Sequence, residues 1–299
     1  RLEPRPRNVS APRLGDALVA MLGALGQPVW RWAVGGWSFF IAENVVLSHN
    51  RAAIISALGD DAKETKYHVL YGSCSTLAVA SIAYGYVRKV RHAPPFQFAA
   101  GAAPPLWRLA AGFPLAALGL AGLAQAAPKV QVPVVMKDAP ATAQQLGGRD
   151  GGGGVWAVRC PFDFADAATK AAEASGAAGP HGVKRVSRHS GFWSLGLCGL
   201  GAALLTPSAP QAAWLAMPSL VALIGGAHQD YRHRRGQGGS LPPEYDAATS
   251  NLPFLAMLRG AQGPVSSAFS ALADEVKVSN ALMAASAAAV WVVRKAARR

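Results

Sequence analysis

Six apolar runs, separated by polar and often basic segments, constrain the fold of this chain more than any other feature. They cover residues 33–48, 67–87, 106–126, 191–205, 212–227 and 280–293. The longer runs approach the roughly 20 residues that an α-helix needs to cross a bilayer. Small residues within the runs allow helices to pack closely in lipid. The pattern predicts an all-α fold, a polytopic transmembrane helical bundle with about five to six spans plus interfacial amphipathic helices.

The charge content agrees with a membrane location. Charged residues make up 15% of the chain and hydrophobic residues 51%, whereas about a quarter of the residues of ordinary soluble domains are charged. The net charge of +13 lies mainly between the apolar runs, as in membrane proteins whose basic loops meet anionic headgroups. We therefore expect membrane lipids as partners and no nucleic acid.

Four segments are expected along the chain, each with its own composition. They are a basic N-terminal segment at 1–28 with an interfacial helix at 14–25, the first three transmembrane helices at 29–128, a long polar loop rich in Gly and Ala at 129–187, and the C-terminal helices and basic tail at 188–299. The Arg-rich N-terminus resembles the remnant of an organelle transit peptide. A plastid thylakoid or envelope is the favoured location, ahead of the mitochondrial inner membrane.

Several possible cofactor motifs are missing from the sequence. Cys74, Cys160 and Cys198 form no CxxC pair, so we predict neither a zinc site nor a disulfide framework. The glycine run at 151–154 lacks the Lys and Ser of a phosphate-binding loop. It is interpreted as a linker, and no metal site is expected.

Counting crossings places the ends of the first and fifth runs and the start of the fourth on one side of the membrane. This predicts that polar side chains from three parts of the chain gather at one interface, namely His49, Arg51, Arg188, His189, His228, Asp230 and Arg232, with Ser250 following on that side. The histidines are either ligands of a metal-containing pigment or hydrogen-bonding groups at span ends. Asp230 either orients an imidazole for proton transfer or forms a salt-bridged helix end.

Glu43 and Asn44 lie inside the first apolar run. A carboxylate there is costly unless it is neutral, paired or close to water. Two interpretations stay open: Glu43 contacts a cofactor or partner, or it pairs with an arginine such as Arg31 or reaches the interface.

Three stretches of the C-terminal half occur in an ordered succession. They are Gly182 to His189, similar to G-x-x-R-x-[ST]-R-H-P; Gly226 to Arg232, with Asp230; and Ser250 to Phe254, similar to S-x-I-P-F. Arg51, Leu58 to Asp60 and Tyr67 to Tyr71 extend the similarity upstream. In these motifs the chain resembles the NnrU family, which includes the plant 15-cis-ζ-carotene isomerases.

The resemblance implies a helical membrane protein with a b-type haem between two histidines and redox-dependent isomerisation of a carotenoid double bond. This chain has Asn44 and Ala202 where the family motifs place those histidines, and Ser190 in place of the motif proline. Asn is a poor haem ligand and Ala cannot be one. Because the protein contributes cofactor placement to such chemistry, we expect a chain that is not an enzyme.

The leading hypothesis is therefore a non-catalytic NnrU-like accessory subunit of an organellar, photosynthetic membrane complex. Its expected partners are pigments and other membrane subunits, and its expected cofactors are chlorophyll, carotenoid or lipid at His49, His189 and His228. The alternative is a haem-dependent carotenoid cis-trans isomerase with relocated ligands. A third hypothesis is an ion or metabolite transporter that uses Glu43.

Overall fold

The computed structural model describes residues 27–59, 65–94, 106–126, 134–137, 155–158, 179–276 and 278–297. The predicted interfacial helix at 14–25, the glycine run at 151–154, Cys160 and the terminal Arg298 and Arg299 lie outside the described residues. All six apolar runs are helical, which confirms the helical fold class.

The main helices follow the apolar runs closely. They are α2 (Pro28–His49), α4 (Thr65–Arg88), α5 (Leu106–Ala126), α9 (Ser190–Leu204), α10 (Ala209–Leu220) and α15 (Val278–Ala297). Shorter elements are α3 (Arg51–Leu58), a 3-10 turn (Val90–His92), α8 (Val183–Val186), α11 (Gly226–His233), α12 (Pro243–Ala248), α13 (Leu255–Leu258) and α14 (Val265–Glu275). The predicted polar loop contains one antiparallel ribbon of β1 (Val134–Lys137) and β2 (Val155–Val158), with Val134 opposite Val158.

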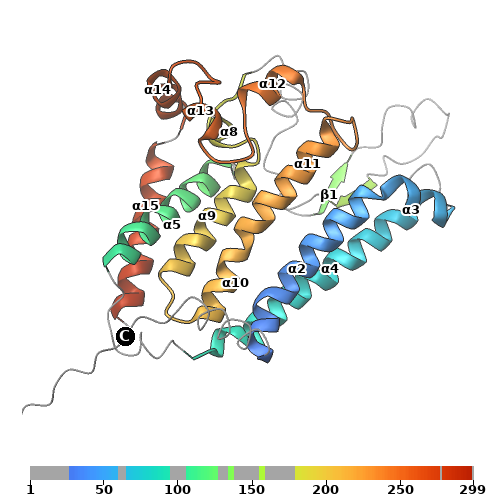
Figure 1. Ribbon diagram of the computed structural model, residues 1–299, viewed down its shortest axis with the longest axis horizontal. Helices are drawn as coiled ribbons and strands as arrows, with labels where there is room; N and C mark the ends of the chain where they lie inside the picture. Colours follow the sequence, from blue (N-terminus) through green and yellow to red (C-terminus); the bar gives the residue numbers. More distant parts are fainter. Residues whose placement is uncertain are drawn as a thin grey trace, which may run out of the picture.

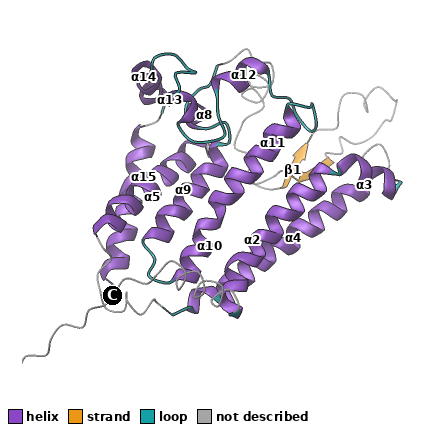
Figure 2. Ribbon diagram, in the orientation of Figure 1, coloured by secondary structure: helices purple, strands orange, loops and turns teal. Residues whose placement is uncertain are grey.

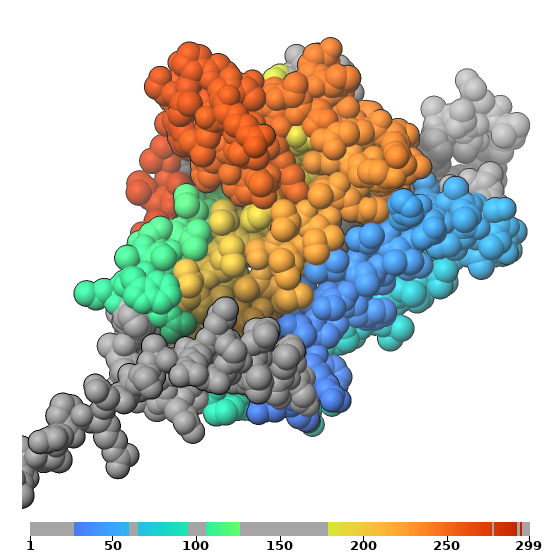
Figure 3. Space-filling view, in the orientation of Figure 1, coloured from blue at the N-terminus to red at the C-terminus, as the bar shows by residue number. Residues whose placement is uncertain are grey.

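The main helices form a single row in the order α15, α5, α9, α10, α2 and α4 (Figure 1). The short helices α8, α12, α13 and α14 and their loops lie together across one end of the helices, over α15, α9 and α11, and we call this group the cap (Figure 2). In the space-filling view the orange and red cap elements cover that end of the helices (Figure 3). The short elements of the C-terminal half are thus gathered at one end of the helices.

Glycines bring the central helices of the row close together. A Cβ atom at Gly199 of α9 would collide with the carbonyl oxygen of Leu215 in α10. A Cβ atom at Gly201 would collide with the backbone of Gly112 and Ala116 in α5. Contact through small residues is how helices associate without a hydrophobic driving force. Backbone proximity therefore holds α9 between its two neighbours.

The fifth apolar run is interrupted within its length. Pro218 lies inside α10, and the helix continues through a π-helical turn (Val221–Gly225) into α11. Proline removes a helical hydrogen bond, and single π turns occur frequently near functional sites. The turn sets the rotation of α11, and with it the direction of His228, Asp230 and Arg232.

Much of the apolar surface of the row is exposed. Among the residues that the structure describes, two helical stretches are long and apolar enough to cross a membrane, Leu106–Gln125 and Ala209–His233, and Ser190–Leu204 and Val278–Trp291 are shorter apolar helices. Within the two long stretches only 17% and 22% of the most apolar window is buried, whereas a core helix of a soluble protein is mostly buried. Large side chains such as Leu77, Leu106 and Met283 are exposed by 64%, 82% and 65%.

Candidate functional site

Arg188 connects three segments where the cap meets the row. It is buried, and its guanidinium donates hydrogen bonds to the Asp246 carboxylate in α12 and to the Thr249 carbonyl oxygen at 2.6 Å. The Asp230 carboxylate of α11 lies 3.5 Å away. These acceptors bind both terminal nitrogens of the guanidinium, while its Nε atom is buried without a hydrogen-bond partner. Arg188 therefore holds α11 and α12 against the start of α9.

His189 joins the same network through Asp230. Its Nε2 atom lies 2.7 Å from the buried Asp230 Oδ1, and its ring stacks on Phe192. Asp230 contacts both Arg188 and His189, so the geometry contains a salt-bridged helix end and also a carboxylate that holds an imidazole, and both interpretations of Asp230 stay open.

Two cap carboxylates have pKa values set by arginines. Hydrogen bonds from Arg234, at 2.5 Å, and from Arg188 lower the pKa of Asp246 from 3.8 to about 2. Hydrogen bonds from Arg185, at 2.6 Å and 2.8 Å, lower the pKa of Glu275 and join α8 to α14. The cap is thus held together by ionised pairs at neutral pH.

Sequence reasoning missed Asp246 and Glu275, although the salt bridges of both residues stabilise the cap. Asp246 lies in a short polar helix, and Glu275 ends an amphipathic one. No motif or spacing marks either residue, because their partners are 58 and 90 residues away in the sequence.

The structure brings together two of the three predicted histidines. The rings of His49 in α2 and His228 in α11 have centroids 6.2 Å apart. The Nε2 atom of His228 lies 2.7 Å from the Ser48 hydroxyl, and His49 stacks on Tyr231. The predicted polar residues thus form two clusters that share α11, one with His49 and His228 and one with Arg188, His189 and Asp230.

Glu43 and Asn44 belong to a hydrogen-bond network between α2 and α4. The Glu43 carboxylate is buried and accepts hydrogen bonds from Ser75 at 3.0 Å and from Asn44 at 2.5 Å. Asn44 accepts one from the Tyr71 hydroxyl at 2.5 Å. Among the residues that the structure describes, no ion pair joins Glu43 to Arg31, so that suggested pairing is wrong. Two neutral donors, Ser75 on α4 and Asn44 on α2, take its place.

Ser250 lies in the loop that docks on the start of α9. Its carbonyl oxygen accepts a hydrogen bond from the Arg188 amide at 3.0 Å, and its hydroxyl donates to Leu252. Phe254 adopts a left-handed conformation with φ of 62°, and its amide donates to the Val186 carbonyl. The motif stretches around Arg188 and Ser250 are therefore in direct contact.

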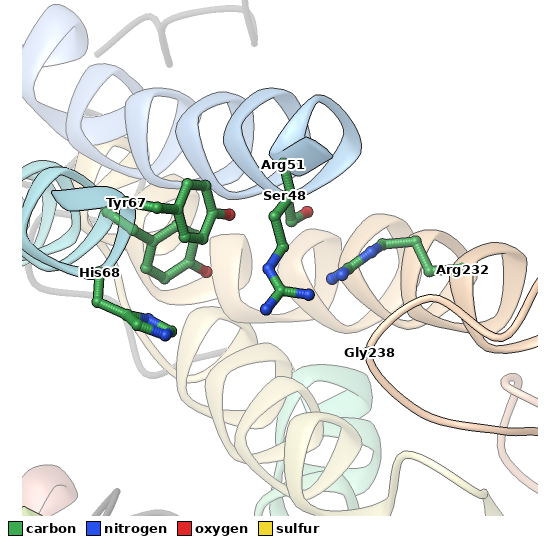
Figure 4. Close-up of a pocket in the computed structure, with 7 residues that line it drawn as sticks. Ser48, Arg51, Tyr67, His68, Arg232 and Gly238 are labelled. Carbon is green, nitrogen blue, oxygen red and sulfur yellow. The ribbon is translucent and has the colours of Figure 1, made fainter. Parts of the chain in front are cut away.

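A cavity of about 240 Å³ lies where α2, α3, α4 and α11 meet. It is lined by Ser48, Arg51, Tyr67, His68, Tyr71, Arg232 and Gly238. The Arg51 and Arg232 side chains extend toward each other, and the His68 ring points toward the same space (Figure 4). Two residues of the resemblance, Arg51 and Arg232, thus meet at one opening.

The positions at which the resemblance places haem ligands do not fit a haem. Asn44 lies in α2, where Tyr71 and the Phe40 carbonyl hold its amide. Ala202 lies in α9, and α10 stands between α9 and α2 in the row. Within the described part of the chain, no group of three or more His, Cys, Asp or Glu side chains is placed to hold a metal ion.

No family model, no curated protein and no solved structure matches the chain. The resemblance to the NnrU family therefore depends on the motif residues alone.

Proposed function

We propose that the chain is a non-catalytic, NnrU-like integral membrane protein that serves as an accessory subunit of a photosynthetic membrane complex and contacts pigments or lipids. Its six spans are α2, α4, α5, α9, α10–α11 and α15, of which α5 and α10–α11 are the ones long and apolar enough to cross a membrane among the described residues. Its location is a plastid membrane, the thylakoid or envelope.

The observation that carries the proposal is the exposed apolar surface at both edges of the helix row. At one edge α4 exposes Val69 and Leu77, and at the other α15 exposes Leu282, Met283 and Val290. Contiguous apolar surface of this kind marks contact with a membrane or another protein. Lipid can cover the faces of a row, and neighbouring subunits can cover its edges.

The state of the polar groups supports a non-catalytic role. His189 is engaged by Asp230 and His228 by Ser48. The positions of Asn44 and Ala202 offer no imidazole. Four polar residues of the family motifs, Arg188, His189, Asp230 and Ser250, thus serve to join helices and cap.

Native mass spectrometry of a gently solubilised membrane tests this proposal. The chain should travel with a large pigmented assembly. Leu77→Glu in α4 and Met283→Glu in α15 form a matched pair of single charges at opposite edges. The variant at the edge that faces another subunit should release the chain, and the other should not. Migration of the unmodified chain as a single colourless polypeptide would contradict the accessory role.

One observation favours the alternative, a haem-dependent carotenoid isomerase. His49 and His228 present two imidazoles with centroids 6.2 Å apart, tilted by 47°, close to the cavity. Iron binding by His228 through Nε2 would require the contact with Ser48 to break. An absorption spectrum of the purified protein decides: a bis-histidine haem band lost in His49→Ala and kept in His189→Ala would replace our proposal.

A further inference from the structure

The cavity at the end of α2 and α11 has a strongly basic lining. Arg51, Arg232 and His68 approach it from α3, α11 and α4, and the remaining lining residues are hydroxyl-bearing side chains and a glycine. None of these described lining residues is acidic. Two guanidinium groups that extend toward each other repel, since arginine stays protonated. An anion between them would offset that repulsion.

Arg232 differs from three arginines close to it. Arg185, Arg188 and Arg234 each bind a carboxylate. Arg232 forms no ion pair with any residue that the structure describes, and its Nε atom, like that of Arg188, is buried without a hydrogen-bond partner. The Arg232 side chain is partly buried, so its charge loses hydration that no protein partner replaces. Arg232 is therefore available to an external acceptor.

The loop after α11 shapes the cavity around this side chain. Gly238 has a φ of 76°, and a Cβ atom there would lie 2.9 Å from the Arg232 Nη2 atom. Glycine adopts this left-handed conformation without strain and lets the backbone pass directly beside the guanidinium. The loop thus forms a wall of the cavity at the charged group.

The hydroxyls of the lining are already committed as donors. Ser48 donates to the Asn44 carbonyl at 2.5 Å, and Tyr67 donates to the Leu47 carbonyl at 3.1 Å. Tyr71 donates to the Asn44 side chain. These groups fix the shape of the cavity, and recognition of a ligand falls to the charged donors, Arg232 above all.

We propose that the cavity binds a phosphate group, carried by a lipid headgroup or by a free phosphorylated compound. Guanidinium forks match phosphate oxygens, and a tetrahedral anion accepts hydrogen bonds from several directions at once. A cavity of 240 Å³ equals about eight water volumes, so a phosphate fits together with the first atoms of its substituent. Only the lipid source depends on the proposed membrane location.

Two arms of one experiment separate the sources. In neutral detergent, calorimetry follows binding of inorganic phosphate to the full chain. In nanodiscs of phosphatidylcholine with or without phosphatidic acid, native mass spectrometry counts the phosphatidic acid retained. Arg232→Gln should weaken binding about tenfold or more, since a charge-assisted hydrogen bond is lost. Arg259→Gln removes an exposed charge outside the cavity and should change affinity by less than about twofold.

Weaker binding by Arg232→Gln in both arms supports the shared phosphate chemistry. Weaker binding in a single arm supports the proposal and identifies the source of the phosphate. Circular dichroism checks that each variant is folded. If Arg232→Gln does not fold, phosphate binding by Arg51→Gln and Arg232→Lys is measured in its place. Equal binding by all variants, or no binding in either arm, overturns the proposal. This result leaves the mass-spectrometric test of the complex unaffected.

Discussion

The cap and the centre of the helix row hold together in opposite ways. In the cap, Arg188, Asp230 and Asp246 meet through charged hydrogen bonds between segments far apart in the sequence. In the centre, Gly199 and Gly201 let the helix backbones touch, and the Cys198 thiol adds a weak hydrogen bond to the Ala116 carbonyl oxygen at 3.8 Å. The cap depends on electrostatics and therefore on pH, whereas the centre depends on shape. A change of charge and a change of volume should thus affect different regions.

The largest effect is expected from a change of charge in the cap. Arg188→Met leaves the Asp230 and Asp246 carboxylates without their shared partner, so it should lower the free energy of unfolding by about 3–5 kcal/mol. Arg234→Met removes a half-exposed partner of the same Asp246 and should cost at most about 1 kcal/mol. Denaturation of both variants in mixed micelles measures the difference. Equal losses would show that the buried network is no stronger than a surface pair.

A change of volume in the centre should have the next largest effect. Gly201→Val places side-chain atoms against the α5 backbone, so it should destabilise the fold by about 1–3 kcal/mol through overpacking. A Cβ atom added at Gly72 in α4 would meet open space, so Gly72→Val is the matched control. Thermal unfolding in detergent compares the two. A neutral Gly201→Val would mean that α5 and α9 move apart without cost.

The smallest effect is expected from a change of pH, which should lower the stability of the cap and leave that of the centre unchanged. The pKa of Asp246 falls from 3.8 in the unfolded chain to about 2 in the fold. The ionised carboxylate therefore contributes stability above about pH 4, and this contribution, about 2 kcal/mol at most, is lost as the pH falls toward 2. Unfolding measured across that range should show the loss, and Asp246→Asn should remove this part of it. If the free energy of unfolding of Asp246→Asn falls with decreasing pH as steeply as that of the unmodified chain, the acid sensitivity belongs to other groups.

The centre could be predicted from the sequence and the cap only in part. Hydrophobic runs in the sequence directly indicate where the helices lie, because a helix in apolar surroundings needs a continuous apolar stretch. Alternating directions of the helices then placed Arg188, His189 and His228 on one side. The choice of partners depends on loop geometry, so the contacts of Asp246 with Arg188 and of Ser48 with His228 left no pattern in the sequence. Ion pairs between short helices that are far apart in the sequence leave no such pattern either.

The π-helical turn at Val221–Gly225 holds one residue more than a regular α-helix would place over the same path. Deleting one residue within the turn would let the helix close to regular α-helical spacing and keep the direction of α11. Deleting a second residue would find no extra residue to remove and would rotate His228, Asp230 and Arg232 by about 100°, away from Ser48, His189 and the cavity together. The turn thus lets this helix lose one residue, and no more, before both polar clusters come apart.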